Sequence, residues 1–296
     1  YGDHRDLHLS LRRQRQMCIR DRIGMSKKYK LGVIGNPIEH SLSPFIHSRF
    51  ARNQNINMEY LPYKINDVDF DKFIKEFFKD DMATGLNVTL PHKKRAAGLD
   101  EKISNEAKFI NAVNTISKNN NKILLNTTDG VGFISDLRDD KNFDLKGTNV
   151  LFIGAGAAAE SILYKVARES TSHISVMNRT EENAERLIRK YSNITSIDNA
   201  KNSSYTYDLI INCSSAGLTG NFEPVQEISF SEKAFFYDLN YSLGETPFCK
   251  WASEKSTNVF DGIGMLIHQA AHSFNIWFKV FPETKSVLED LESMRE

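Results

Sequence analysis

The segment Val150-Leu-Phe-Ile-Gly-Ala-Gly-Ala-Ala-Ala159 determines which fold the sequence predicts. Its four apolar residues predict a short buried strand, and a helical pattern follows the glycines directly. In this G-x-G-x-x-A spacing, Gly154 permits a tight turn, Gly156 lets the backbone approach a phosphate, and Ala159 allows close helix–strand packing. A small-residue turn that serves packing alone is the alternative. The strand–turn–helix context favours a Rossmann-type dinucleotide site, with the phosphates at the helix N-terminus.

The end of the next predicted strand distinguishes NADP from NAD. This strand ends at Met177, and Asn178-Arg179-Thr180 follows where NAD enzymes usually carry an acidic residue for the ribose 2′-hydroxyl. An arginine provides a planar cation that suits a 2′-phosphate, whereas a carboxylate would repel it. A solvated arginine in a βα loop is the other interpretation of Arg179. Because the glycine turn lies upstream, we predict NADP as the cofactor.

Alternating strand and helix patterns predict an α/β architecture with parallel sheets and two domains. Upstream of residue 129, the predicted strands are 29–35, 58–63, 85–89, 112–117 and 123–126, and the predicted helices are 44–53 and 69–78. Downstream, the predicted strands are 149–153, 173–177, 208–212, 234–239 and 258–260, and the predicted helices are 157–168, 181–191, 262–278 and 284–294. We expect an N-terminal substrate-binding domain of residues 25–128, completed by helices within 262–296. Residues 129–261 are expected to form a Rossmann NADP-binding domain, with a cleft between the two.

Composition and charge exclude several classes of protein. Of the 296 residues, 40% are hydrophobic and 26% are charged, as in globular rather than disordered or membrane-embedded proteins. Lysine plus arginine equals aspartate plus glutamate at 38 each, so no net charge attracts nucleic acid or an anionic membrane. The three cysteines lack the spacing of a metal site or a disulfide framework, which favours a reducing cytoplasm. We therefore expect a small-molecule substrate and no metal, nucleic-acid or membrane partner.

Residues 1–24 differ from the rest of the chain. They contain six arginines and three aspartates, and they lack the apolar core of a secretory signal. They precede Met25 and the first predicted strand. We interpret them as a non-native or disordered leader, with a genuine basic arm as the alternative.

Polar residues gather at the ends of the predicted upstream strands. Ser41 and Ser43 precede a helix, where they could cap it or bind a carboxylate together with the helix N-terminus. Asn87 and Thr89 alternate with apolar residues and therefore point to the same face of one strand. Lys93 follows a proline turn at the end of that strand, as either a surface charge or a partly desolvated proton donor.

A further cluster contains Asn114 and, later in the chain, Asp129 at the junction of the two predicted domains. Asp129 could cap the next helix, or it could hold a lysine and a substrate hydroxyl together in a cleft. The residues alone leave both alternatives open. His92 is expected to be a loop residue rather than a catalyst.

Seven motifs in order resemble those of the shikimate dehydrogenase family. They are GNPIEHSLSP (35–44), NVTLPHK (87–93), NAVNT (111–115), TTDG (127–130), GAGAAA (154–159), NRT (178–180) and DGIGMLIHQAA (261–271). The resemblance runs from about residue 30 to about residue 281. It implies an NADP-dependent oxidoreductase that reduces 3-dehydroshikimate to shikimate with NADPH, a step of chorismate and aromatic amino acid biosynthesis.

The resemblance also implies roles for individual residues. Lys93 and Asp129 would be the catalytic pair. The residues implied to bind the substrate are Ser41, Ser43, Asn87, Thr89, Asn114, Tyr241 and Gln269. Those implied to bind NADP are Gly154, Ala155, Gly156, Ala157, Ala158, Asn178, Arg179 and Thr180, with Gly262 and Met265 against the nicotinamide.

Two positions depart from the family pattern. Thr127 stands where many members have asparagine, and Asn183 stands where many have a second basic residue. Arg179 would then hold the 2′-phosphate alone. An NAD-linked quinate/shikimate dehydrogenase would share every motif, and a non-catalytic nucleotide-sensing protein is a further alternative. A monomer and a homodimer are both compatible with the sequence.

Overall fold

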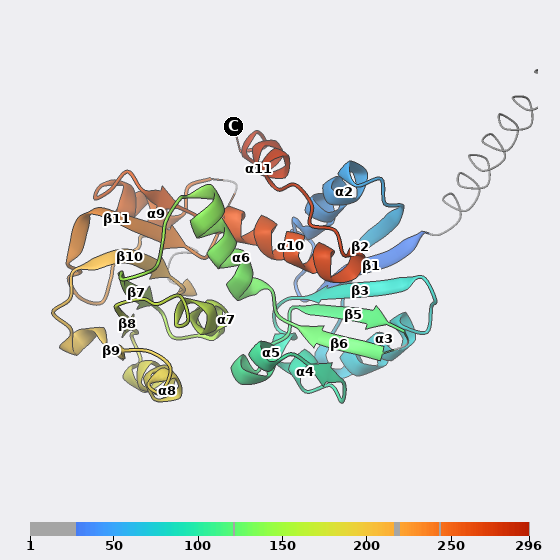
Figure 1. Cartoon of the computed structure of the whole chain (residues 1–296), viewed down its shortest axis with the longest axis horizontal. Coiled ribbons are helices and arrows are strands. Elements are labelled where there is room, and N and C mark those ends of the chain that lie inside the picture. Colours follow the sequence, from blue (N-terminus) through green and yellow to red (C-terminus); the bar gives the residue numbers. More distant parts are fainter. Residues whose placement is uncertain (1–27, 121, 216–219, 243, 296) are drawn as a thin grey trace, which may run out of the picture.

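The computed structural model describes residues 28–120, 122–215, 220–242 and 244–295. These residues form two lobes, each built around a six-stranded sheet (Figure 1). Residues 1–24, interpreted above as a leader, lie outside the described part of the chain. None of the described helices is both long and apolar enough to span a membrane.

The first sheet is mixed, with the strand order β2-β1-β3-β5-β6-β4. Its strands are β1 (Tyr29–Gly35), β2 (Met58–Lys64), β3 (Ala83–Val88), β4 (Lys102–Ile103), β5 (Thr115–Asn119) and β6 (Lys122–Asn126). β1 runs parallel to β2 and β3, whereas β5 runs antiparallel to both β3 and β6. The predicted parallel arrangement is therefore confirmed for the other strands of this sheet and is wrong for β5. β5 and β6 follow each other too closely for a crossover helix, so they pair as a hairpin.

Four helices and one short 3₁₀ turn connect these strands. They are α2 (Ser43–Asn53), η1 (Asp67–Asp69), α3 (Phe70–Phe77), α4 (Lys93–Ala97) and α5 (Asn105–Ile110). Phe70 and Ile74 of α3 are buried against Leu86 of β3, as their i, i+4 spacing predicts. α4 and α5 were not predicted, because one or two turns are too short to show helical periodicity.

The second sheet is parallel and confirms the predicted Rossmann fold. Its strands are β7 (Asn149–Ile153), β8 (His173–Met177), β9 (Ile197–Asn199), β10 (Tyr207–Asn212), β11 (Phe230–Asp238) and β12 (Val259–Phe260). Their order, β12-β11-β10-β7-β8-β9, is that of a doubly wound sheet. The strand order reverses between β7 and β10, where ligands of such sheets bind. The connecting elements are α7 (Ala157–Val166), α8 (Glu181–Tyr191), η3 (Ala200–Asn202) and α9 (Pro247–Ser253).

The lobes are joined by helices that cross between them. These elements are α6 (Asp129–Ser135), the π-helical turn η2 (Asp136–Asp140), α10 (Ile263–Phe278) and α11 (Lys285–Glu292). α6 packs along α10, and Figure 1 shows α10 running from the second lobe across the first. Ile267 and Phe274 of α10 share a hydrophobic core with Ile46 and Phe50 of α2. The C-terminal part of the chain thus packs back onto the first lobe.

One predicted strand begins later than expected, because the residues before it form hydrogen bonds near the candidate site instead. The strand expected at 112–117 is observed at Thr115–Asn119. The backbone N–H of Val113 bonds instead to the carbonyl of Lys93, 3.0 Å away, and that of Asn114 bonds to the carbonyl of Asn126, 3.1 Å away. The first bond ties the loop before β5 to the start of α4, and the second ties it to the end of β6.

Trp277 shows how closely α10 packs on the first sheet. Its indole lies over Gly85 of β3, where a Cβ atom would come within 2.0 Å of Nε1. Nε1 also donates a hydrogen bond to the carbonyl of Ile116 in β5, 3.0 Å away. A glycine at position 85 is therefore a packing requirement.

We expect Gly85→Ala to lower the free energy of unfolding by about 1–3 kcal/mol, because the added methyl displaces Trp277. Urea denaturation measures the loss. Gly98→Ala is the control, since its nearest new contact is the Arg95 carbonyl at 3.3 Å. Similar losses for the two variants would show that the packing of Trp277 over Gly85 is not tight.

Candidate active site

Two adjacent pockets lie where the lobes meet. The larger, of about 670 Å³, follows the carboxyl ends of β7, β8 and β10. The smaller, of about 300 Å³, is lined by β3, α10 and the start of α6. The residues predicted to bind NADP line the larger pocket, except Gly262 and Met265. These two line the smaller pocket. All the residues predicted for catalysis and for substrate binding line the smaller pocket as well. Lys93 lines both pockets.

The glycine turn after β7 has the backbone geometry that its sequence predicts. Gly154 adopts a φ of +104°, and a Cβ atom there would lie 2.9 Å from the backbone nitrogen of Ser214. A Cβ atom on Gly156 would meet nothing within 4 Å, although Gly156 lines the pocket. The turn is therefore packed against β10 on one side and open to a ligand on the other. α7 begins directly after it, so free N–H groups face this space.

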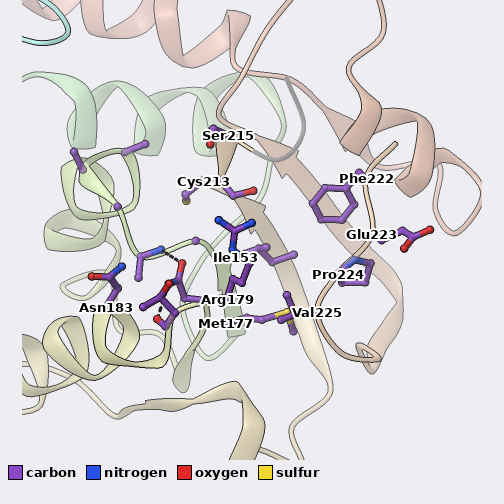
Figure 2. A pocket seen from close by; sticks show the side chains of 18 of the residues that line it. Ile153, Met177, Arg179, Asn183, Cys213, Ser215, Phe222, Glu223, Pro224 and Val225 are labelled. Atoms are coloured by element: carbon purple, nitrogen blue, oxygen red, sulfur yellow. Dashed lines mark hydrogen bonds between the residues drawn. The ribbon is translucent and has the colours of Figure 1, made fainter. Parts of the chain in front are cut away.

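The Asn178-Arg179-Thr180 segment forms the neighbouring wall. The Oδ1 atom of Asn178 accepts a hydrogen bond from the backbone N–H of Ala155 at 3.1 Å, and its Nδ2 donates to the carbonyl of Thr180 at 2.7 Å. Arg179 is exposed and forms no ion pair with any described residue. Figure 2 shows its side chain extending into the pocket, with Asn183 on one side. A guanidinium without an acidic partner in the described chain therefore faces this pocket at the place expected for a 2′-phosphate.

Acidic groups near the turn are neutralised or lie apart from Arg179. Glu160, in the first turn of α7, is paired with Arg186 at 3.1 Å and with Lys190. Glu223 also lines the pocket, but Figure 2 shows its carboxylate well apart from the Arg179 guanidinium. The pocket's backbone donors, its arginine and its open glycine fit a dinucleotide with an additional phosphate.

Lys93 and Asp129 form an ion pair at the meeting point of the two pockets. The Lys93 Nζ atom lies 2.7 Å from Oδ2 of Asp129. Lys93 is the first residue of α4, and Asp129 is the first residue of α6. The Asp129 side chain is 8% exposed and that of Lys93 is 25% exposed, so the ammonium keeps access to a ligand.

His92 anchors the start of α4 and thereby places Lys93. Its ring is fully buried and bonds to the carbonyl of Ile65 at 2.7 Å and to the carboxylate of Asp67 at 2.8 Å. As expected, His92 lies in a turn, directly before α4, and there its buried ring joins α4 to the segment after β2. It does not line either pocket among the described residues.

Asn114 holds the other carboxylate oxygen of Asp129. Its Nδ2 atom lies 2.9 Å from Oδ1 of Asp129, and its Oδ1 accepts from the backbone N–H of Thr128 at 2.8 Å. Nδ2 also lies 3.2 Å from Oε1 of Gln269 in α10. Thr127, which replaces the family's asparagine, is buried, and its hydroxyl has no partner among the described residues. Asp129 is therefore held without a side chain from position 127.

Hydroxyl groups dominate the far end of the smaller pocket. The Ser41 Oγ atom accepts a hydrogen bond from the backbone N–H of Ser43 at 3.3 Å, at the beginning of α2. Tyr241 reaches the same pocket from the loop after β11. Among the described lining residues, Lys93 is the one lysine or arginine. An anion bound at this end would be met by hydroxyls and a helix start.

A buried polar contact fixes the start of α10 against the second lobe. The Tyr237 hydroxyl donates to Oδ2 of Asp136 at 2.6 Å and accepts from the backbone N–H of Met265 at 3.2 Å. Burial raises the pKa values of both Asp136 and Tyr237. A Cβ atom on Gly262 would lie 2.4 Å from the Leu239 carbonyl, so this junction requires glycine. Gly262 and Met265 line the smaller pocket, and these contacts hold both residues in place.

Several lining residues were missed by the sequence analysis. They include His40, Leu90, Cys213, Ser214, Ser215 and the segment 222–225. Cys213 to Ser215 follow β10 directly, so the rule that ligands bind at the carboxyl ends of parallel strands could have identified them. Nothing in the local sequence around 222–225 signals that this segment folds over the pocket.

Three family models match consecutive parts of the chain. They describe the shikimate dehydrogenase substrate binding domain at residues 33–116, shikimate/quinate 5-dehydrogenase at 137–239, and the shikimate 5′-dehydrogenase C-terminal domain at 262–289.

Individual proteins match over nearly their whole length. The shikimate dehydrogenase (NADP(+)) of Legionella pneumophila (strain Corby) is 39% identical over 265 residues, which cover 89% of this chain and 98% of the relative. The crystal structure of shikimate dehydrogenase from Aquifex aeolicus has a TM-score of 0.78 at 30% identity, covering 90% of this chain and 98% of that one. Shikimate 5-dehydrogenase from Thermus thermophilus, solved with NADP(H) and shikimate, has a TM-score of 0.78 at 26% identity, covering 90% and 99%. The chain belongs to the shikimate dehydrogenase family.

Proposed function

We propose that this chain reduces 3-dehydroshikimate to shikimate with NADPH, as an oxidoreductase of chorismate and aromatic amino acid biosynthesis. The observation that carries the proposal is the 2.7 Å ion pair between Lys93 and Asp129, because Lys93 faces both pockets. The name of the Legionella relative and the shikimate and NADP(H) bound to the Thermus protein support this assignment.

NADP(H) would occupy the larger pocket. The turn from Gly154 to Ala158 would hold the pyrophosphate at the start of α7, and Asn178 to Thr180 would surround the adenosine ribose. Arg179 would bind the 2′-phosphate. Gly262 and Met265 would lie beside the nicotinamide, next to the substrate. When bound, NADPH supplies the hydride that the substrate carbonyl carbon receives.

Lys93 would donate the proton in the reductive direction and accept it in the oxidative direction. As the C3 carbonyl is reduced, negative charge develops on its oxygen, and the ammonium stabilises this charge and then donates a proton. Lys93 becomes a neutral amine, which takes a proton back in the oxidative direction. Asp129 would orient the Lys93 side chain through the 2.7 Å ion pair between Nζ and Oδ2.

The remaining lining residues would bind the rest of the substrate. Ser41 and Ser43 would bind the carboxylate through their hydroxyls and the start of α2, with Tyr241 nearby. The side chains proposed for the ring hydroxyls are Asn87, Thr89, Asn114 and Gln269. The carboxylate would thus be bound by neutral donors, since the described lining of this pocket contains no arginine.

We propose that the chain consists of two domains. Residues 25–128, completed by residues 262–296, would form the substrate-binding domain, and residues 129–261 would form the NADP-binding domain. Every residue that the proposal uses belongs to one chain, so a monomer and a homodimer would both be active. We also propose a cytoplasmic location, since Cys213 and Cys249 are free thiols.

The direct test is an initial-rate assay of shikimate oxidation that follows NADPH formation by its near-ultraviolet absorbance. We expect turnover with shikimate and NADP⁺, and much lower kcat/KM with NAD⁺ or with quinate. Preference for quinate and NAD⁺ would assign the chain to the quinate/shikimate alternative. Nucleotide binding without turnover of either substrate would make it a nucleotide sensor.

We expect Lys93→Ala to lower kcat by about 10²–10⁴-fold and to leave KM for shikimate within a few-fold, because its main contact forms in the transition state. Steady-state kinetics at saturating NADP⁺ measure both constants. Lys94→Ala is the matched control, since Lys94 is the exposed neighbour in α4. Turnover of the Lys93 variant within a factor of two of the control would rule out its role.

Replacing Arg179 with glutamine should weaken NADP⁺ binding by about 1.5–3 kcal/mol, the scale of a hydrogen bond to a charged group. Binding of NAD⁺, which lacks the 2′-phosphate, should hardly change. Fluorescence titration of both cofactors measures the difference, with the exposed Arg189→Gln as control. Equal losses for the two cofactors would contradict the 2′-phosphate assignment.

A further inference from the structure

A buried tyrosine supports one of the residues that line the substrate pocket. The hydroxyl of Tyr60 in β2 lies 2.7 Å from Oδ1 of Asn87 in β3. Asn87 lines the pocket, whereas Tyr60 is 6% exposed and is absent from the described lining residues. Tyr60 therefore acts on a ligand through residues that line the pocket, and its 2.7 Å hydrogen bond goes to Asn87.

The amide nitrogen of Asn87 is already fully used within the protein. Nδ2 lies 3.1 Å from the backbone carbonyl of Asn114, 3.0 Å from Oγ of Ser273 and 3.3 Å from Oγ1 of Thr115. Because a peptide carbonyl can only accept, the nitrogen rather than the oxygen must face Asn114. The two hydrogens of Nδ2 thus have three acceptors, and no donor of Asn87 is left for a ligand.

The oxygen of Asn87 keeps one free acceptor site. Tyr60 donates to one lone pair of Oδ1, and no other described donor, the neighbouring His47 ring included, forms a hydrogen bond to that oxygen. Burial raises the pKa of Tyr60 well above its usual value, so its hydroxyl keeps the proton that it donates. The Tyr60 ring stacks on His47 with centroids 4.3 Å apart, and burial lowers the pKa of His47 to about 3, which leaves that ring neutral. The packing therefore holds Tyr60 in place without a competing charge.

We propose that Tyr60 is a positioning residue for substrate recognition, which fixes Asn87 as a hydrogen-bond acceptor toward the pocket. This inference rests on the proposed function and deepens it. An acceptor binds a hydroxyl and repels a carbonyl oxygen, so Asn87 would bind a ring hydroxyl that the reaction leaves unchanged. Lys93, which has only donors, suits the oxygen that alternates between carbonyl and hydroxyl. Together the two side chains set which ring oxygen faces the cofactor.

The kinetic test compares Tyr60→Phe with Tyr207→Phe. Tyr207 is a matched control because it is buried, donates one hydrogen bond to Ser203 Oγ at 2.9 Å, and belongs to the other sheet. We expect Tyr60→Phe to raise KM for shikimate about three- to tenfold, the scale of one neutral hydrogen bond. Its kcat and its KM for NADP⁺ should stay within about twofold of the control, because Tyr60 touches neither the cofactor pocket nor Lys93. A purely structural role would lower stability without this selective change in KM.

A mutant cycle shows whether the effect passes through Asn87. In an Asn87→Ala background, Tyr60→Phe should change KM by less than about twofold, because the group that it positions is gone. With deoxy analogues of shikimate, the effect should vanish for the analogue that lacks the hydroxyl bound by Asn87. Tyr60→Phe kinetics equal to those of Tyr207→Phe, or a full additional loss in the Asn87→Ala background, would overturn the proposal.

A second measurement needs neither turnover nor a folded Tyr60 variant. In the ¹⁵N–¹H spectrum of the wild-type protein, the Asn87 side-chain amide is assigned by its loss in Asn87→Ala. We expect both amide protons to exchange slowly with solvent, as buried donors do. Fast exchange would show that Asn87 has a free donor and would refute the inference. Slow exchange in a protein that fails to oxidise shikimate would leave the inference about Asn87 intact and reject the proposed function instead.

Discussion

The geometry of the site depends on the ion pair between Lys93 and Asp129, which the surrounding residues hold in place. A carboxylate as buried as that of Asp129 is stable only when both of its oxygens find partners, and Lys93 and Asn114 provide them. Each member of the pair begins a helix, so small shifts of α4 or α6 would separate them. The buried ring of His92 and the backbone bond from Val113 to Lys93 hold α4 in place. The fold thus places one polar pair at the junction of two pockets.

Particular charged and polar groups at the two pockets, rather than the net charge of the protein, provide the attraction for anionic ligands. The chain carries 38 basic and 38 acidic residues, so attraction must arise from particular groups. At the larger pocket these are the backbone donors at the start of α7 and the guanidinium of Arg179. Arg186 and Lys190 neutralise Glu160, the one acid in that helix turn. At the smaller pocket the ligand-facing groups are mostly hydroxyls and amides, whose hydrogen bonds select by geometry.

The sequence was most informative where a local rule operates. The spacing of Gly154 and Gly156 predicted both the turn and its ligand, and strands β1, β7 and β8 have the predicted bounds. The resemblance to the family implied nine catalytic and substrate-binding residues, all of which line one pocket. Their chemical roles remain a proposal, because proximity does not show which atoms a substrate touches.

Features that depend on distant parts of the chain could not be predicted. The antiparallel β5 results from a hairpin with β6, and the alternating strand and helix patterns did not predict the direction of β5. The contact of Asn87 with Tyr60 and Ser273 joins residues 27 and 186 positions apart, and no local pattern signals it. Short helices such as α4 and α6 begin with site residues and lack the length that would show periodicity.

A crystal structure of the chain with shikimate and NADP⁺ tests the central claim most directly. The account predicts that the Lys93 ammonium lies within hydrogen-bond distance of the C3 oxygen, about 2.6–3.2 Å, while it stays paired with Asp129. The nicotinamide should face C3 from the side of Gly262 and Met265. A ring bound with another oxygen at Lys93, or a nicotinamide outside the junction of the two pockets, would contradict the account.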